Sequence, residues 1–336
     1  MKTDKILLDH GSGGRASHKL VSELILKYFN NPILEKLDDS AVFEVEQGRL
    51  AFSTDSYTVD PIFFPGGDIG ELAINGTVND LAMLGAEPRY LSVGFILEEG
   101  FLISDFDRIL QSMRKAAEEA SVKIVTGDTK VVPRGAADKI FVNTSGVGFI
   151  PRNVNIAGKN AKPGDKIIVS GTIADHGVTV LTQREGLSFQ SALTSDTAPL
   201  NHLVAAMIST SDQIHVLRDP TRGGVATTMN EIAIQSAVGV MLYEDAIPIR
   251  DDVRGACELL GLDPLYIANE GKLLACVPAD HVDRVLASMH HNRYGKDACM
   301  IGEITNDYPG KVFLKTTIGG TRIVDMLVGE QLPRIC

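Results

Sequence analysis

The chain has 336 residues, of which 44% are hydrophobic and 22% charged, with a formal net charge of −11. This length predicts two domains with cores of their own, and the acidic balance excludes a nucleic-acid surface, which needs clustered Lys and Arg. No apolar run is long enough to span a membrane, and the N-terminus lacks the apolar stretch of a signal peptide. We therefore expect a cytoplasmic protein with no nucleic-acid or membrane partner.

Short β-rich runs alternate with helical segments in the first half of the chain. The patterns predict a strand at 50–55, a helix at 68–84, a strand at 89–97, a helix at 104–120, and strands at 122–128 and 139–150. A polar, turn-rich stretch follows at 151–164 and includes a Pro-Gly pair. We place the domain boundary there, which gives a first domain of residues 1–152.

The second half continues the α/β alternation. It predicts a strand at 165–171, a helix at 174–184, a strand at 215–219, a helix from 223, and strands at 238–244, 272–278 and 311–317. We assign residues 153–322 to this second domain and 323–336 to a C-terminal tail, because its last part contains a proline and little periodicity. The expected fold is mixed α/β, with a cleft between the two domains as the usual location for a ligand.

Acidic residues accompany several of these elements. Asp55 and Asp128 each end a predicted strand, Asp38 and Asp39 precede one, and Asp80 lies in the helical run 75–88. Carboxylates that converge at strand ends repel one another unless a cation neutralises them, and magnesium shares such oxygen ligands with nucleotide phosphates. As a set they predict a magnesium–nucleotide site. Taken singly, each also fits a turn or a helix cap.

Two glycine-containing loops are candidates for anion binding. His10-Gly-Ser-Gly-Gly lets a backbone approach a phosphate, but its spacing matches neither a Walker loop nor a dinucleotide fingerprint. Arg218-Asp-Pro-Thr-Arg222-Gly-Gly precedes a helix, whose free N–H groups suit an anion together with the two arginines. A loose N-terminal segment and a capped helix start remain the structural alternatives. Glu270, between two apolar stretches, is by itself an ordinary turn residue.

The four cysteines fall into two groups. Cys257, Cys276 and Cys299 form no C-x-x-C pair and are expected to be small buried residues of a reduced protein. Cys336 is the final residue, on a tail that can reach about 30 Å when extended. Accessible thiolates are nucleophiles, so Cys336 is predicted to carry the reaction. The alternative is an incidental terminal cysteine.

The motifs taken together resemble a known family. HGSGG, DDSAV, STDSYTVDP, NGTVNDLAMLGAEP, TGDTKVV, SGTIADHG, RDPTRGG, ANEG and the terminal PRIC are similar to the carbamoyl dehydratases of nickel–iron hydrogenase maturation, in the aminoimidazole ribonucleotide synthetase superfamily. The resemblance runs from residue 10 to residue 336, and the terminal PRIC narrows it to this member. It implies two α/β domains, a homodimer through the N-terminal domains, and ATP bound near the dimer interface.

The resemblance also implies a reaction on the terminal thiol. A partner carbamoyltransferase would place a carbamoyl group on Cys336, and ATP would phosphorylate the carbamoyl oxygen. Loss of phosphate and of a nitrogen-bound proton would leave a thiocyanate. The cyano group would then pass to iron held on a scaffold complex and become a cyanide ligand of the hydrogenase.

By motif position, the resemblance implies site residues of three kinds. The expected magnesium ligands are Asp39, Asp55, Asp80 and Asp128. The expected nucleotide-binding residues are Gly11, Gly13, Gly14, Asp38, Asn75, Gly127, Thr129, Arg218 and Arg222, the two arginines also suiting substrate or tail. Lys130 and Glu270 are expected to remove the proton and to stabilise charge around the carbamoyl group on Cys336. His176 is either a site residue or a loop histidine.

Two rival functions are weighed against this one. The chain could be another ATP-using superfamily member, a small-molecule kinase or synthetase, or a non-catalytic thiol carrier switched by nucleotide. A selenophosphate synthetase is disfavoured because no cysteine precedes Cys257. A kinase or synthetase should tolerate loss of Cys336, and ATP hydrolysis that depends on carbamoylated Cys336 would exclude a simple carrier.

Overall fold

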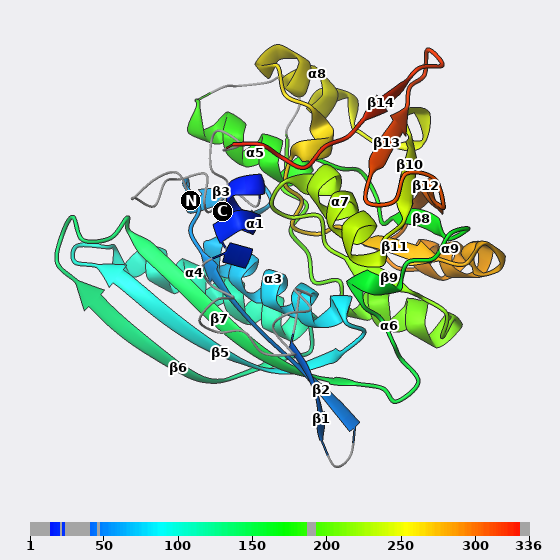
Figure 1. Ribbon diagram of the computed structural model, residues 1–336. Coiled ribbons are helices and arrows are strands. Elements are labelled where there is room, and N and C mark those ends of the chain that lie inside the picture. Colours follow the sequence, from blue (N-terminus) through cyan, green and yellow to red (C-terminus); the bar gives the residue numbers. More distant parts are fainter. Residues whose placement is uncertain (1–13, 21, 24–40, 46–47, 187–192, 330–336) are drawn as a thin grey trace.

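The computed structural model describes residues 14–20, 22–23, 41–45, 48–186 and 193–329. Figure 1 shows two sheets, one from each half of the chain, with helices packed between and around them. The short helix α1 (Arg15–Leu20) precedes the first sheet in the chain. No helix of the described part of the chain has both the length and the apolar character that crossing a membrane requires.

The first half builds a five-stranded sheet of order β1-β2-β7-β5-β6. The strands are β1 (Ala41–Val45), β2 (Gly48–Tyr57), β5 (Glu87–Glu98), β6 (Lys123–Val132) and β7 (Ile140–Ile150). Neighbours are antiparallel except β5 and β6, which are parallel. Helices α3 (Ile69–Met83) and α4 (Ile103–Glu119) cover one face of this sheet (Figure 1). We call the other face the open face, because no described segment packs on it.

Helix α3 lies at the centre of the molecule. Its N-cap is Asp68, whose Oδ1 accepts hydrogen bonds from the backbone N–H groups of Gly70 and Glu71 at 2.8 and 3.1 Å. Almost every residue of the helix is buried, as expected for a helix that is apolar around most of its circumference. It packs on the first sheet on one side and on the second half on the other, so it positions any side chain that points between the two halves.

The second half builds a seven-stranded sheet of order β14-β13-β10-β12-β8-β11-β9. Its strands are β8 (Lys166–Val169), β9 (Val216–Arg218), β10 (Gly239–Tyr243), β11 (Leu274–Val277), β12 (Cys299–Thr305), β13 (Val312–Lys315) and β14 (Thr321–Ile323). Its helices are α5 (Asp175–Arg184), α6 (Asn201–Thr210), α7 (Gly224–Ser236), α8 (Asp251–Leu260) and α9 (Val282–His290). A small hairpin of β3 (Phe63–Phe64) and β4 (Gly67–Asp68) completes the strands.

The predicted elements are all present, with ends shifted by a few residues, but two expectations were wrong in detail. Neither Asp55 nor Asp128 ends a strand, because β2 continues to Tyr57 and β6 to Val132, where it pairs with β5 along its length. The expected tail start, residue 323, is still part of β14, and Val324 is fully buried in the hydrophobic core of the second half. Helices α1, α6, α8 and α9 and strands β3, β4, β12 and β14 were not predicted.

The two halves share one of the hydrophobic clusters. It joins Leu81 and Met83 of α3 to Leu203 of α6 and to Leu273, beside β11, all of them fully buried. The expectation of two separately cored domains is therefore incomplete, because α3 contributes apolar side chains to a core that belongs to both halves.

Candidate active site

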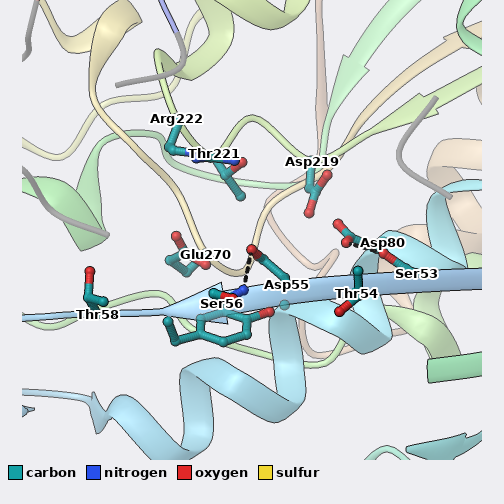
Figure 2. Close-up of a pocket in the computed structure, with 12 residues that line it drawn as sticks. Ser53, Thr54, Asp55, Ser56, Thr58, Asp80, Asp219, Thr221, Arg222 and Glu270 are labelled. Atoms are coloured by element: carbon teal, nitrogen blue, oxygen red, sulfur yellow. Dashed lines mark hydrogen bonds between the residues drawn. The ribbon is translucent and has the colours of Figure 1, made fainter. Parts of the chain in front are cut away.

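A pocket of about 390 Å³ opens between β2 and α3 of the first half and two loops of the second half. Its lining residues are Ser53, Thr54, Asp55, Ser56, Tyr57, Thr58, Gly76, Asp80, Asp219, Thr221, Arg222 and Glu270. Asp55 and Asp80 lie on one side of the pocket, Asp219 and Arg222 lie across from them, and Glu270 lies between the two sides (Figure 2). The fold thus brings together four of the predicted site residues, which come from β2, α3 and two loops: Asp55, Asp80, Arg222 and Glu270.

Asp55 and Asp80 form the wall contributed by the first half. Asp80 Oδ2 accepts a hydrogen bond from Ser53 Oγ at 2.6 Å, and Asp55 Oδ1 accepts one from the backbone N–H of Ser56 at 2.7 Å. Burial raises the pKa of Asp55 above its ordinary value, and the positive charge of Arg222 opposes that shift. Negative charge is therefore unfavourable in this pocket until a cation offsets it.

Asp219 is a site residue that the sequence analysis missed. Burial raises the pKa of its carboxyl to about 6, with a further contribution from the negative charge of Asp55, while Arg218 opposes the shift. Asp219 directly follows β9, so the strand-end rule that selected Asp55 would have found it. Only the two arginines of the same motif were predicted to be site residues.

The pocket fits a magnesium-bound polyphosphate. Asp55, Asp80 and Asp219 offer the hard oxygen ligands that magnesium prefers. Arg222 and the start of α7 provide positive charge and backbone N–H groups suited to phosphate oxygens. Among the described residues, no three potential ligands are close enough to enclose a metal ion unaided. A ligand set completed by nucleotide oxygens is the usual arrangement for magnesium.

The raised pKa of Asp219 gives a stability prediction. The unfolded carboxyl ionises near its ordinary pKa of 3.8 and the folded one at about 6, so ionisation destabilises the folded state increasingly between those pH values and fully above them. Asp219→Asn is therefore expected to stabilise the nucleotide-free protein by about 1–2 kcal/mol near pH 7.5, with the gain disappearing near pH 4. Thermal unfolding in a chelating buffer measures this. A lower melting temperature than wild type near pH 7.5 would contradict it.

Tyr57 and Glu270 complete the floor of the pocket. The Tyr57 hydroxyl lies 3.4 Å from Thr77 Oγ1, and burial followed by the charges of Asp55, Asp80 and Glu270 raises its pKa, so it stays neutral. A Cβ atom at Gly76 would lie 2.2 Å from that hydroxyl, which explains the glycine in the middle of α3. Glu270 is almost fully buried, in the loop that precedes β11.

Asp128 and Lys130 lie elsewhere in a single chain. The register places Asp55, Thr144, Val93 and Gly127 in one row across the sheet, and Thr144 and Val93 are buried beneath the helices. Asp128 falls in the next row, with exposed neighbours, so it projects from the open face. Lys130 projects from the same face and forms an ion pair with Asp128 at 3.0 Å. Three strand spacings of about 4.8 Å separate β6 from β2.

Other predicted residues do not line the pocket of the single chain. Arg218 donates a hydrogen bond to Glu231 of α7. Asn75 is buried in α3, and its Nδ2 donates to Thr197 Oγ1 at 3.3 Å. Gly14 lies against the C-terminal segment, since a Cβ there would be 2.5 Å from the Leu327 carbonyl oxygen. Thr129 belongs to β6. Gly11, Gly13, Asp38, Asp39 and Cys336 lie outside the described residues.

His176, Cys257 and Cys276 are core residues, and Cys299 is partly buried against the core. His176 is fully buried at the start of α5, its Nδ1 lies 2.8 Å from Ser195 Oγ, and burial lowers its pKa to about 4. Burial raises the pKa of Cys257 to about 11 and also raises that of Cys276 and Cys299. The prediction that these three thiols are inert is consistent with their placement.

Comparisons with known proteins identify the family of the chain. Residues 37–150 match the family "AIR synthase related protein, N-terminal domain", and residues 162–315 match its C-terminal domain. Carbamoyl dehydratase HypE of Azotobacter vinelandii is 52% identical over 100% of this chain and 98% of its own length. The chain belongs to the carbamoyl dehydratase HypE family. The predicted domain boundary near residue 153 falls between the two family matches.

Two solved structures of HypE proteins share the fold. A hydrogenase maturation protein HypE in complex with ATP has a TM-score of 0.84 and 54% identity, covering 99% of this chain and 100% of that one. A HypE–HypF complex contains a chain with a TM-score of 0.88 and 47% identity, covering 92% of this chain and 99% of that one. One of these HypE proteins thus binds ATP, and one forms a complex with HypF.

Proposed function

We propose that this protein is an ATP-dependent carbamoyl dehydratase that acts on a carbamoyl group carried by its own Cys336. The observation that carries the proposal is the pocket in which Asp55 and Asp80 of the first half meet Asp219, Arg222 and Glu270 of the second. Full-length similarity to carbamoyl dehydratases supports it. A kinase or synthetase would not need the terminal thiol, and a simple carrier would not need buried carboxylates around a polyphosphate pocket.

The chemistry follows from the poor leaving ability of a carbamoyl oxygen. Phosphoryl transfer from ATP to that oxygen turns it into phosphate, which leaves readily, and the nitrogen gives up both of its protons in the course of the reaction. The products are a thiocyanate on sulfur, ADP and phosphate. Tethering the carbamoyl group to Cys336 makes each step effectively intramolecular. The cyano group then serves as the cyanide ligand of nickel–iron hydrogenase iron.

Each pocket residue has a role in this proposal. Asp55, Asp80 and Asp219 would hold magnesium, with Asp39 as a further ligand by motif position, and magnesium supplies charge neutralisation for the transferred phosphoryl group. Arg222 would contact the phosphates. Glu270, enclosed by the pocket and close to the acidic cluster, would accept the proton from nitrogen.

We further propose that the active form is a homodimer whose interface is the open face of the first sheet. Phe52, Tyr90, Ile96 and Phe149 are exposed on that face, an apolar surface typical of a protein contact. Asp128 and Lys130 project from it too, out of reach of the pocket in their own chain. A second copy seated there would supply both residues to the neighbouring pocket, where Lys130 would stabilise negative charge, with Gly127 and Thr129 beside the nucleotide.

Mixed dimers test this arrangement. Asp55→Asn and Lys130→Met homodimers are each expected to be inactive, whereas refolding the two chains together should restore activity. Random pairing makes half of the dimers mixed, and one of the two sites in each is complete, so about a quarter of wild-type activity is expected. Lys159→Met, at an exposed lysine of the second half, is the control and should stay fully active. No recovery in the mixture would place Lys130 in its own chain's site.

The proposal includes two partners. A carbamoyltransferase would load Cys336, in line with the HypE–HypF complex among the related structures. An iron-holding scaffold complex would receive the cyano group. A free nucleophilic thiol and ATP as co-substrate both favour the reducing cytoplasm.

A further inference from the structure

A short segment of the second half, residues 195–200, holds the loop that carries Glu270. Asp196 Oδ1 accepts a hydrogen bond from the backbone N–H of Glu270 at 3.1 Å. The second carboxylate oxygen of Asp196 forms an ion pair with Lys272 Nζ at 3.3 Å, and both side chains are largely buried. Asp196 is thus fixed at both oxygens by residues on either side of Gly271.

The carbonyl group of Glu270 is held from the opposite direction. Asn79 of α3 donates from Nδ2 to the carbonyl oxygens of Glu270 at 3.3 Å and of Ala198 at 3.0 Å. Its Oδ1 accepts from the backbone N–H of Leu200 at 2.8 Å. Asn79 therefore ties the Glu270 loop and the 195–200 segment to the helix that also carries Asp80.

The two backbones approach so closely that residue 271 must be glycine. A Cβ atom at Gly271 would lie 1.7 Å from the Asp196 carbonyl oxygen and 2.9 Å from the backbone nitrogen of Ala198. The segment itself is anchored, because the backbone N–H of Ser195 donates to the Pro65 carbonyl at 2.8 Å and Ser195 Oγ accepts from Thr197 N–H at 3.1 Å. The Glu270 loop thus rests on a rigid support.

We propose that Asp196 is a positioning residue for the dehydration step, acting through Glu270. This inference rests on the function proposed above, in which Glu270 accepts the substrate proton. Both backbone polar groups of Glu270 are fixed by side chains from other segments, which fixes the point from which its side chain enters the pocket. A buried acid paired with a buried lysine is costly to maintain for support alone, since an apolar pair of similar volume often serves stability as well. Misplacing a reacting group by 1 Å can cost about 100-fold in rate.

A double-mutant cycle between Asp196 and Glu270 tests the proposal. Asp196→Ala is expected to slow dehydration of the pre-carbamoylated protein about 10- to 100-fold while leaving the affinity for Mg-ATP unchanged. In the Glu270→Gln background the same substitution should cause almost no further loss, because the group it positions no longer accepts a proton. If the two losses multiply, Asp196 does not act through Glu270 and the positioning role is refuted. If Glu270→Gln alone keeps full activity, the proposed base fails, and the positioning role fails with it.

A second variant guards against a folding defect in Asp196→Ala. Asp196→Asn combined with Lys272→Met keeps an oxygen acceptor for the Glu270 N–H and removes both buried charges together. We expect it to retain most of the wild-type rate with an unchanged pH profile. A rate as low as that of Asp196→Ala in this folded double variant would overturn positioning by the hydrogen bond.

Discussion

Replacing Glu270 by Gln is expected to slow conversion of the carbamoyl group to the thiocyanate by about 100- to 10,000-fold, the usual contribution of a positioned general base. Glutamine has nearly the same shape but cannot accept a proton. The affinity for Mg-ATP should change little, because the three aspartates of the pocket remain. The measurement is a single turnover of pre-carbamoylated protein with Mg-ATP. Intact-protein mass spectrometry monitors the reaction as a decrease in protein mass equal to one water.

Glu118→Gln is the matched control for that experiment, since Glu118 is an exposed residue of α4 that does not line the pocket and forms an ion pair with Arg114 on the same helix. It should turn over at the wild-type rate. An unchanged rate in Glu270→Gln would remove Glu270 from the mechanism. A loss of Mg-ATP affinity as large as the loss of rate would instead assign Glu270 to metal or nucleotide binding.

Cys336→Ser is expected to abolish the reaction altogether while leaving the nucleotide pocket intact. After incubation with the carbamoyltransferase, carbamoyl phosphate and ATP, wild-type protein should gain a carbamoyl mass increment that maps to Cys336. The variant should gain none, because a serine hydroxyl is far less nucleophilic than a thiolate. Its Mg-ATP affinity, measured by calorimetry, should match that of wild type.

Cys299→Ser controls for general effects of removing a thiol. Cys299 is only partly buried, and burial raises its pKa, so it is the strongest competitor among the described cysteines and still a poor nucleophile. This variant should be carbamoylated normally. A mass increment that survives in Cys336→Ser and maps to another cysteine would contradict the proposed carrier.

The sequence pattern predicted most strands and helices α3, α4, α5 and α7, because their apolar runs are bounded by polar turns. It missed helices α6, α8 and α9. It also predicted that Asp55 and Asp80 belong to one site, through the strand-end and helix positions of acidic residues. The prediction that a strand ends at Asp128 was wrong. The Gly-Asp pair there is typical of a turn, but the hydrogen-bonded pairing of β6 with β5 continues past it. Local propensity cannot report a pairing partner that lies far away in the chain.

The positions of Lys130 and Asp196 show a second limit. Nothing in TGDTK indicates which face of a strand Lys130 occupies, because that depends on the register with β5 and β7. Asp196 was not singled out, since its neighbours resemble an ordinary polar loop. Its significance comes from Lys272 and the Glu270 backbone, more than 70 residues away. Both facts are properties of tertiary contacts, not of local composition.

The core shared through α3 also bears on how the protein unfolds. Leu81 and Met83 pack with Leu203 and Leu273, so separating the halves would expose apolar surface on both. A chain cut near residue 153 should therefore yield two fragments that are insoluble alone and soluble when co-expressed. Calorimetry of the intact protein should give one cooperative transition, and Mg-ATP, by bridging the same junction, should shift that whole transition upward rather than split it.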